Sequence, residues 1–365
     1  MSSVVYLNTQ LPVLVVSLLW LLTWVFFILN RDAQTISGGD KSGTLIREKS
    51  PVGLVSETVF GRVTLVTLIA FTLIALNLRF VGGFIIFEQL MVNSFSRDML
   101  IVLSVFYIIL QFITCNVSFC KVNLSLEYLY SLSIFFVMSP LLYFSASIYS
   151  FFFLLEVLGV LVVLLFSSLT YLGSKRNLSN EYASDTVNPA PARLITSLFT
   201  QFWISFFSTV LLILFLIVSL FVWNTSMYYE LNAIIVASNV APGTAHSAFI
   251  VLWDFLFIFG FFLKAGIAPL HLFKIEVYRG LPFFTIFIYT FLYFLSFFLY
   301  FIYMIHWLLP HILYYNTYFL ELIIIFGVLY LSATLFSNRH LKTFLALSSI
   351  LNSLIIFAVV VPLAV

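Results

Sequence analysis

The chain has 365 residues, of which 63% are hydrophobic and only 8% are charged, and its mean hydropathy is +1.15. This composition excludes a soluble globular protein, and a formal net charge of +2 is too small to indicate a nucleic-acid partner. The sequence is also rich in aromatic residues, with 44 Phe and 19 Tyr. Such an excess is typical of AT-rich organelle genomes and favours mitochondrial encoding.

Apolar runs long enough to cross a bilayer recur along the chain. We expect an all-α polytopic membrane protein of about ten transmembrane helices. We place them near residues 8–29, 58–78, 98–116, 126–144, 148–172, 194–222, 246–270, 283–307, 317–336 and 341–362. Polar segments separate several of them, at Arg31–Pro51, Ser174–Arg193 and Met227–Thr244. We divide the chain into an N-terminal three-helix segment, 1–125, and a helix bundle, 126–365.

The basic residues are distributed very unevenly over the predicted loops. When the loops alternate between the two sides, nearly all of the 16 Lys and Arg residues fall on one side. The other side holds only Arg79 and Arg97, and Lys264 lies within the membrane. Basic loops stay on the side from which helices are inserted. We therefore expect both termini on the opposite side, which for the mitochondrial inner membrane is the intermembrane space.

Lys264 is the most informative residue, because it lies inside the apolar run Ala248–Leu270. A charge near mid-bilayer costs about 2.5–3.5 kcal/mol on insertion scales, so such residues usually face a bundle interior and mark an ion or proton path. The alternative is a side chain that reaches the headgroups. Pro269 removes a backbone donor, so we expect a seventh helix broken at Lys264–Pro269. His271, just past the break, could relay a proton or have a structural role.

Glu156 is a second charge within an apolar run, about a third of the way along the fifth predicted span. Desolvation disfavours the ionised carboxyl, so a cationic partner is needed to keep it charged. The alternative is a side chain that reaches the outer interface. Asp254 and Glu321 lie near the outer ends of their spans, and we expect His306 and His311 to anchor helix ends at the interface.

The sequence offers no site for a redox cofactor or a metal. It has no Gly-rich phosphate loop and no pair of histidines at ligand spacing within the spans. Its two cysteines, Cys115 and Cys120, favour buried free thiols over a metal site. We expect no cofactor on this chain.

Several motifs resemble one family. Residues 262–273, FLKAGIAPLHLF, followed by 276–282, EVYRGLP, resemble the central signature of the antiporter-like membrane subunits of respiratory complex I. The E-V-Y-x-G form is most similar to the subunit 2 group of NADH:ubiquinone oxidoreductase. Residues 341–350, LKTFLALSSI, and 154–158, LLEVL, are similar to two further family segments, although Leu154 replaces a glycine. The order and spacing of these motifs agree with the family.

The resemblance implies that Glu156 and Lys264 form a buried ion pair whose making and breaking is linked to proton movement. Flavin, iron–sulfur clusters and quinone would be held by other subunits. The sequence departs from the family pattern at Phe294, which, or a close aromatic neighbour, occupies the place of a lysine in the family's eighth helix. The chain also ends at Val365, before the family's last helices. We therefore expect an incomplete bundle in 126–365, completed by a separate polypeptide.

The expected function is that of a non-redox, membrane-arm subunit of proton-pumping NADH:ubiquinone oxidoreductase in the mitochondrial inner membrane. Its partners would be other membrane subunits of complex I and lipids, without nucleic acid. Two alternatives stay open. One is a structural remnant in the same complex that has no proton path of its own. The other is a cation/proton antiporter subunit, because the motifs around Lys264 are similar in both groups.

Overall fold

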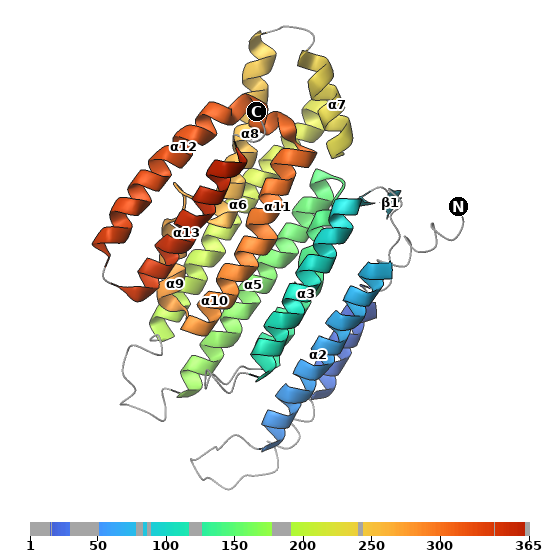
Figure 1. Ribbon diagram of the computed structural model, residues 1–365, viewed down its shortest axis with the longest axis vertical. Coiled ribbons are helices and arrows are strands. Elements are labelled where there is room, and N and C mark those ends of the chain that lie inside the picture. Colours follow the sequence, from blue (N-terminus) through green and yellow to red (C-terminus); the bar gives the residue numbers. More distant parts are fainter. Residues whose placement is uncertain are drawn as a thin grey trace. The chain divides into compact units, whose positions relative to one another are not determined.

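The computed structural model is built almost entirely from α-helices (Figure 1). It describes residue 15 and residues 17–29, 51–77, 83–85, 89–116, 126–176, 191–239, 244–338 and 340–361. Within this part of the chain, seven helices are long and apolar enough to cross a membrane, by length and composition. The predicted fold class, an all-α polytopic membrane protein, is confirmed.

The helices follow one another along the chain. Their bounds are α2 (Pro51–Asn77), α3 (Ser94–Asn116), α4 (Leu126–Met138), α5 (Ile148–Arg176), α6 (Pro191–Trp223), α7 (Tyr228–Asn239), α8 (Thr244–Ala265), α9 (Leu272–Gly280), α10 (Phe283–Tyr293), α11 (Leu299–Tyr303), α12 (Pro310–Ser337) and α13 (Leu341–Val360). A 3-10 segment, η2 (Ser139–Phe144), extends α4, and two π-helical segments, η3 (Phe294–Phe298) and η4 (Met304–Leu308), flank α11. Strands β1 (Gly83–Ile85) and β2 (Leu90–Val92) form a short antiparallel hairpin.

The seven membrane-length helices match the predicted spans three to six and eight to ten. They are Ser94–Ile113, Leu126–Phe144, Ile148–Ser168, Arg193–Trp223, Thr285–Leu308, Asn316–Ser337 and Leu341–Val360. The second predicted span lies in α2, and only residues 17–29 of the first lie in the described part. The seventh is interrupted between α8 and α9, as predicted. The connection expected at 227–244 instead contains helix α7.

The helices form two compact units, of which the first comprises Met1–Ser145 and Val157–Leu172. In this unit α2 packs against α3 and α4. The side-chain amide of Gln111 on α3 donates a buried hydrogen bond of 2.6 Å to the Thr64 hydroxyl on α2. Hydrogen bonds of this kind stabilise helix pairs in lipid, where apolar side chains gain little by leaving the equally apolar acyl chains.

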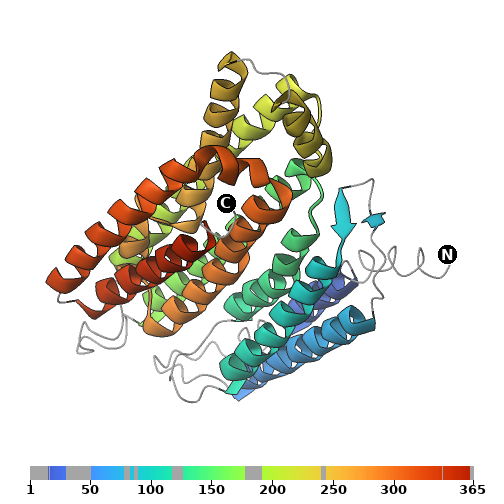
Figure 2. The ribbon, with the colours of Figure 1, turned by 45° about the horizontal axis from the view of Figure 1, so that its top comes forward.

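The second unit comprises Ala146–Glu156 and Gly173–Val365. In this unit α6 packs along α8 and α9, and α12 runs beside α13 (Figure 2). Aromatic rings fill its interior. Phe151 on α5 stacks with Phe261 on α8 at 6.0 Å between ring centroids and with Tyr300 on α11 at 5.2 Å. The start of α5 is thereby fixed against the helix that carries Lys264.

Close helix approach in the second unit depends on Gly280, at the end of α9. A Cβ atom built there would lie 2.5 Å from the Ser197 Cβ and 2.7 Å from the Arg193 carbonyl oxygen, both on α6. A larger side chain would therefore force α6 and α9 apart. Farther along α6, the Ser208 hydroxyl donates a buried hydrogen bond of 2.8 Å to the Gly260 carbonyl of α8. These contacts hold α6 against both halves of the broken helix.

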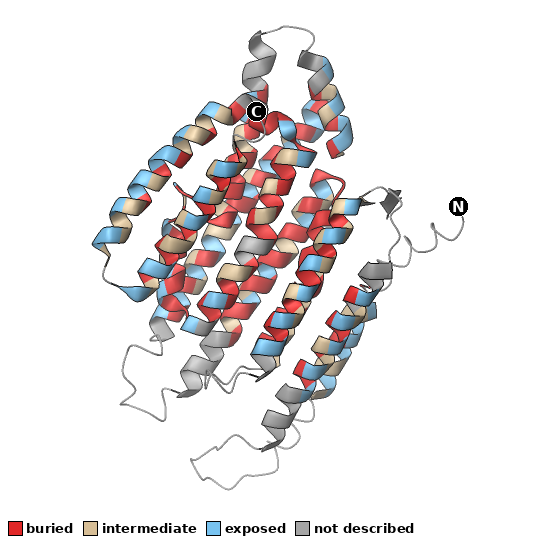
Figure 3. Ribbon diagram, viewed as in Figure 1, coloured by how far each residue is buried: buried red, intermediate tan, exposed pale blue. Residues whose placement is uncertain are grey.

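Exposed residues follow the outward faces of the helices (Figure 3). Many of them are large and apolar, such as Phe199 and Trp203 on α6 and Phe326 and Leu329 on α12. Apolar surface of this extent needs a cover of lipid or of neighbouring membrane subunits.

The predicted division into residues 1–125 and 126–365 separates helices by their place in the expected antiporter-like bundle. The observed units follow contacts instead, and they put α4 together with α2 and α3. The predicted division states which helices belong to the antiporter-like bundle. The observed contacts do not test this, so it stays a prediction.

Candidate functional site

The break in the membrane helix lies between Ala265 and Leu272. Gly266 has a φ of +65°, a backbone conformation that glycine adopts without steric cost. The Ile267 N–H donates to the Phe262 carbonyl at 3.1 Å, so part of the freed backbone is satisfied locally. Pro269 cannot continue the helical hydrogen-bond pattern, because it has no N–H. The residues of the interruption therefore explain why α8 stops directly after Lys264.

Lys264 and Glu156 meet in the second unit. The ammonium Nζ lies 3.0 Å from the carboxylate Oε1 of Glu156, and it also donates to the Ser205 hydroxyl at 2.8 Å. The Lys264 side chain is only 2% exposed, whereas that of Glu156 is 33% exposed. Three helices converge here, since Glu156 lies on α5, Ser205 on α6 and Lys264 on α8. The Lys264 ammonium is therefore enclosed by protein rather than lying on the open surface of this unit.

The unequal burial of the two partners decides how the pair behaves. An ammonium without exposure depends almost entirely on Glu156 and Ser205 for the interactions that water would otherwise supply. The carboxylate is less dependent, because a third of its side chain is open. If the Glu156 side chain moved away, the Lys264 ammonium would thus lose more of its stabilising interactions than the Glu156 carboxylate would. Such an arrangement can couple movement to the uptake or release of a proton.

Ser205 was not predicted. It lies in the aromatic stretch Phe202–Phe207 of α6, where a single hydroxyl gives no periodic signal. The one hint available was that a serine inside a long apolar span needs a hydrogen-bond partner.

His271 lies at the start of α9 and is buried. Its ring packs edge-to-face on Tyr330 of α12, with 5.9 Å between the centroids. Neither ring nitrogen has a well-aligned hydrogen bond with any described residue, although the Pro269 carbonyl lies close to the ring. A Cβ on Gly266 would lie 3.1 Å from Cδ of the buried Lys274, so a second lysine packs on the break. The proton-relay roles of Lys264, Glu156 and His271 stay predictions.

Other predicted residues lie as follows. Phe294 begins the π-helical segment η3, and its side chain lies outside the described part of the chain. The ammonium of Lys342, at the start of α13, donates a hydrogen bond of 2.8 Å to the Leu281 carbonyl. Cys120 and the side chain of Cys115 also lie outside the described part. Among the residues that are described, no group of three or more His, Cys, Asp or Glu side chains is close enough to hold a metal ion.

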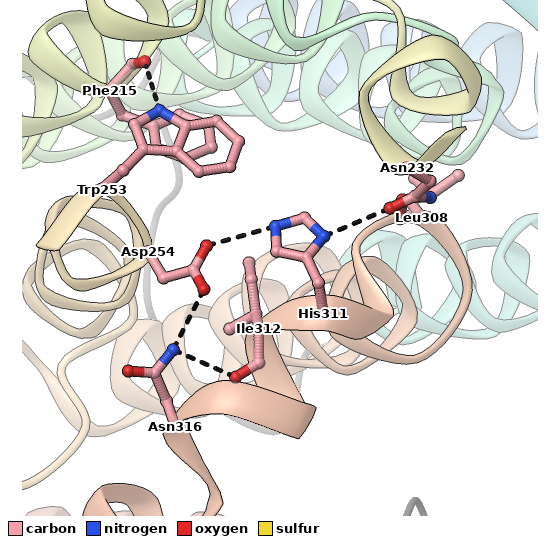
Figure 4. Close-up of polar contacts among 8 residues, drawn as sticks. All are labelled: Phe215, Asn232, Trp253, Asp254, Leu308, His311, Ile312 and Asn316. Atoms are coloured by element: carbon pink, nitrogen blue, oxygen red, sulfur yellow. Dashed lines mark hydrogen bonds and ion pairs between the residues drawn. The ribbon is translucent and has the colours of Figure 1, made fainter. Parts of the chain in front are cut away.

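The expected role of His311 as an anchor at the membrane interface stays a prediction. Its side chain is 6% exposed and lies against Asp254, whose side chain is fully buried (Figure 4). Both residues lie near helix ends in the sequence, but α7, which was not predicted, covers the position of His311.

Among the solved structures that share the fold are chains of two respiratory complexes. A chain of the membrane-bound sulfane sulfur reductase, an archaeal respiratory membrane complex, has a TM-score of 0.65 and 13% identity, and the match covers 95% of this chain and 64% of that chain. A chain of respiratory complex I from Thermus thermophilus with bound aureothin has a TM-score of 0.52 and 14% identity, with coverage of 83% and 61%. This chain therefore spans less than two thirds of the length of either solved chain.

At such low identity the likeness shows the fold alone, which is shared with chains of two respiratory complexes. No protein-family model matches the sequence, and no curated protein matches it significantly.

Proposed function

We propose that this chain is an antiporter-like, membrane-arm subunit of a respiratory complex and that its Glu156–Lys264 pair takes part in proton translocation. The observation that carries the proposal is an ammonium at 2% exposure, 3.0 Å from a carboxylate and directly before a helix break. Ionisable residues in such places usually belong to ion or proton paths. The shared fold with chains of two respiratory complexes supports the same class of protein.

The pair would work through the distance between its two partners. While Glu156 stays at 3.0 Å, the carboxylate stabilises the proton on Lys264. If Glu156 moves away, the ammonium keeps only the Ser205 hydroxyl in a position closed to water, and release of its proton becomes easier. Return of Glu156 favours protonation again. A redox reaction elsewhere in the assembly would supply the free energy that drives these shifts.

The finer proposal is a subunit 2 of mitochondrial NADH:ubiquinone oxidoreductase, in the inner membrane with both termini toward the intermembrane space. The EVYRGLP motif after the break and the organelle-like composition support it. Flavin, iron–sulfur clusters and quinone would then be bound by other subunits of the assembly. This chain would contribute no redox centre of its own.

Two alternatives make different predictions. A structural remnant in the same complex is favoured by Phe294, which stands where the resemblance leads one to expect a lysine. A cation/proton antiporter subunit would share the residues around Lys264. The remnant predicts no effect of Lys264 substitutions on proton movement, and the antiporter predicts sodium-dependent proton exchange in the absence of NADH.

Purification of the native assembly through a tag on this chain separates these functions. We expect co-purifying subunits with flavin and iron–sulfur clusters, and NADH-driven acidification in sealed vesicles that an uncoupler abolishes. Sodium/proton exchange in an assembly without redox subunits would contradict the proposal and favour the antiporter. The same preparation tests whether a separate polypeptide supplies further helices, since such a protein would have to co-purify and pack against this chain.

A further inference from the structure

A second buried polar group, the Asp254 cluster, lies in the second unit away from Lys264. It consists of Asp254 on α8, His311 and Asn316 on α12, and Asn232 on α7 (Figure 4). The Oδ1 atom of Asp254 lies 3.2 Å from Nε2 of His311, and neither atom has another hydrogen-bond partner among the described residues. At these two atoms, the Asp254 carboxyl and the His311 imidazole therefore have only each other as polar partners among the described residues.

The side chain of Trp253 holds the His311 ring of the cluster in place. The indole of Trp253 stacks on the His311 ring at 5.6 Å and 9°, and its N–H donates to the Phe215 carbonyl at 3.1 Å. The exposed fractions of the Asp254 and His311 side chains are 0% and 6%. Well-packed apolar side chains would usually make the fold at least as stable as a buried ion pair does. A contribution to stability therefore does not explain why Asp254 and His311 occupy these positions.

The two amides determine which atoms of the pair can exchange a proton. Asn232 donates through Nδ2 to the Leu308 carbonyl, which forces its Oδ1 toward Nδ1 of His311 at 3.2 Å. An acceptor at that place requires a proton on Nδ1. Asn316 donates through Nδ2 to Oδ2 of Asp254 at 3.1 Å and to the Ile312 carbonyl at 3.2 Å. Nδ1 and Oδ2 are thus committed to the two amides.

Only Oδ1 of Asp254 and Nε2 of His311 then remain to exchange a proton. In the electrically neutral state exactly one proton lies between them, either on the carboxyl or on the imidazole. The groups that face the pair are the amides of α7 and α12 and the indole of Trp253. Among the described residues, no other charged side chain makes an ion pair with either partner.

We propose that Asp254 and His311 form a second proton-binding site, which exchanges protons with Lys264 along α8. This inference rests on the proposed function. Ten residues of α-helix separate Asp254 from Lys264, about 15 Å along the axis, so water or hydroxyl groups must connect them. Release of the pair's one proton toward the end at which α8 begins would leave a carboxylate beside a neutral imidazole. A proton arriving from Lys264 would then restore the one-proton state.

The competing explanation is a purely structural one, in which the cluster only ties α7, α8 and α12 together. Asp254→Asn and His311→Gln separate the two, because each variant keeps a polar side chain but loses the titrating group. Ser208→Ala is a matched control, since it removes a buried hydrogen bond to α8 without removing a proton-binding group.

The test uses the complete assembly in sealed vesicles. We expect Asp254→Asn and His311→Gln to lower the proton-to-electron ratio to the level of Lys264→Met and to flatten its pH profile, while Ser208→Ala keeps the wild-type values. Infrared difference spectra of the wild-type assembly with isotope-labelled aspartate should show a protonated aspartic acid whose signal changes during turnover. This spectrum decides the question even if a variant does not assemble, because absence of any such change overturns the inference.

The outcomes for the inference and for the proposed function can be told apart. If Lys264→Met loses proton coupling while Asp254→Asn and His311→Gln keep the wild-type ratio and pH profile, the second site is refuted and the proposed function stands. If none of the three variants changes the ratio, both are refuted. Loss of coupling in all three, with an aspartate signal in the wild type, supports the second site.

Discussion

Removal of the Glu156 carboxylate should destabilise the second unit more than removal of the Lys264 ammonium. At 3.0 Å and an effective dielectric constant of about 20, the two charges attract by about 5.5 kcal/mol before desolvation is counted. Breaking a buried pair by removing one partner typically costs about 3–5 kcal/mol, because the remaining charge stays buried alone. We expect about 3 kcal/mol for Glu156→Gln, since glutamine still offers an acceptor to the ammonium and proton loss from Lys264 limits the cost.

The reverse substitution should be milder. Lys264→Met leaves a carboxylate that is only partly buried, at 33% exposure, so we expect about 1 kcal/mol. The double variant should be more stable than Glu156→Gln alone, because no unpaired charge remains. Unfolding of the purified assembly in detergent, followed through this chain, measures all three. The reasoning would be refuted if the two single variants lost the same unfolding free energy and the double variant lost the sum of the two.

Two further predictions concern helix packing. Gly280→Ala should destabilise the contact of α6 with α9 by about 1–3 kcal/mol, since its Cβ would lie 2.7 Å from a backbone oxygen. Gly260→Ala should destabilise the protein less, because the closest neighbour of its Cβ, at 3.0 Å, is a leucine side chain that can shift. Thermal unfolding compares the two variants. A larger loss of stability for Gly260→Ala would contradict the packing seen at Gly280. Gln111→Leu should cost about 1 kcal/mol by removing the hydrogen bond to Thr64 in the first unit, and an unchanged unfolding midpoint would show that this bond contributes nothing.

Hydropathy predicted most of the membrane helices, because lipid selects for long apolar runs whatever their neighbours are. It missed α7, whose residues Tyr228–Asn239 mix polar and apolar side chains and resemble a connection. The π-helical segments η3 and η4 also have no signature in the sequence, since they depend on how the turns around α11 pack.

The helix break could be predicted from Lys264 and Pro269 directly, because proline acts on the backbone of its own helix. The partner of Lys264 could not, since 108 residues separate it from Glu156 and no periodic pattern links them. Only the resemblance to a family paired these two residues. The Asp254–His311 contact escaped prediction for the same reason, and because the helix that covers it was itself missed.

The most direct test of the central claim is the number of protons moved per electron by an assembly that carries Lys264→Arg. Arginine keeps the positive charge beside Glu156 but cannot release its proton near neutral pH. We predict that the variant assembles and transfers electrons with a clearly lower proton-to-electron ratio than the wild type. A wild-type ratio in a fully assembled Lys264→Arg complex would contradict the account, because it would mean that the ammonium only holds helices together.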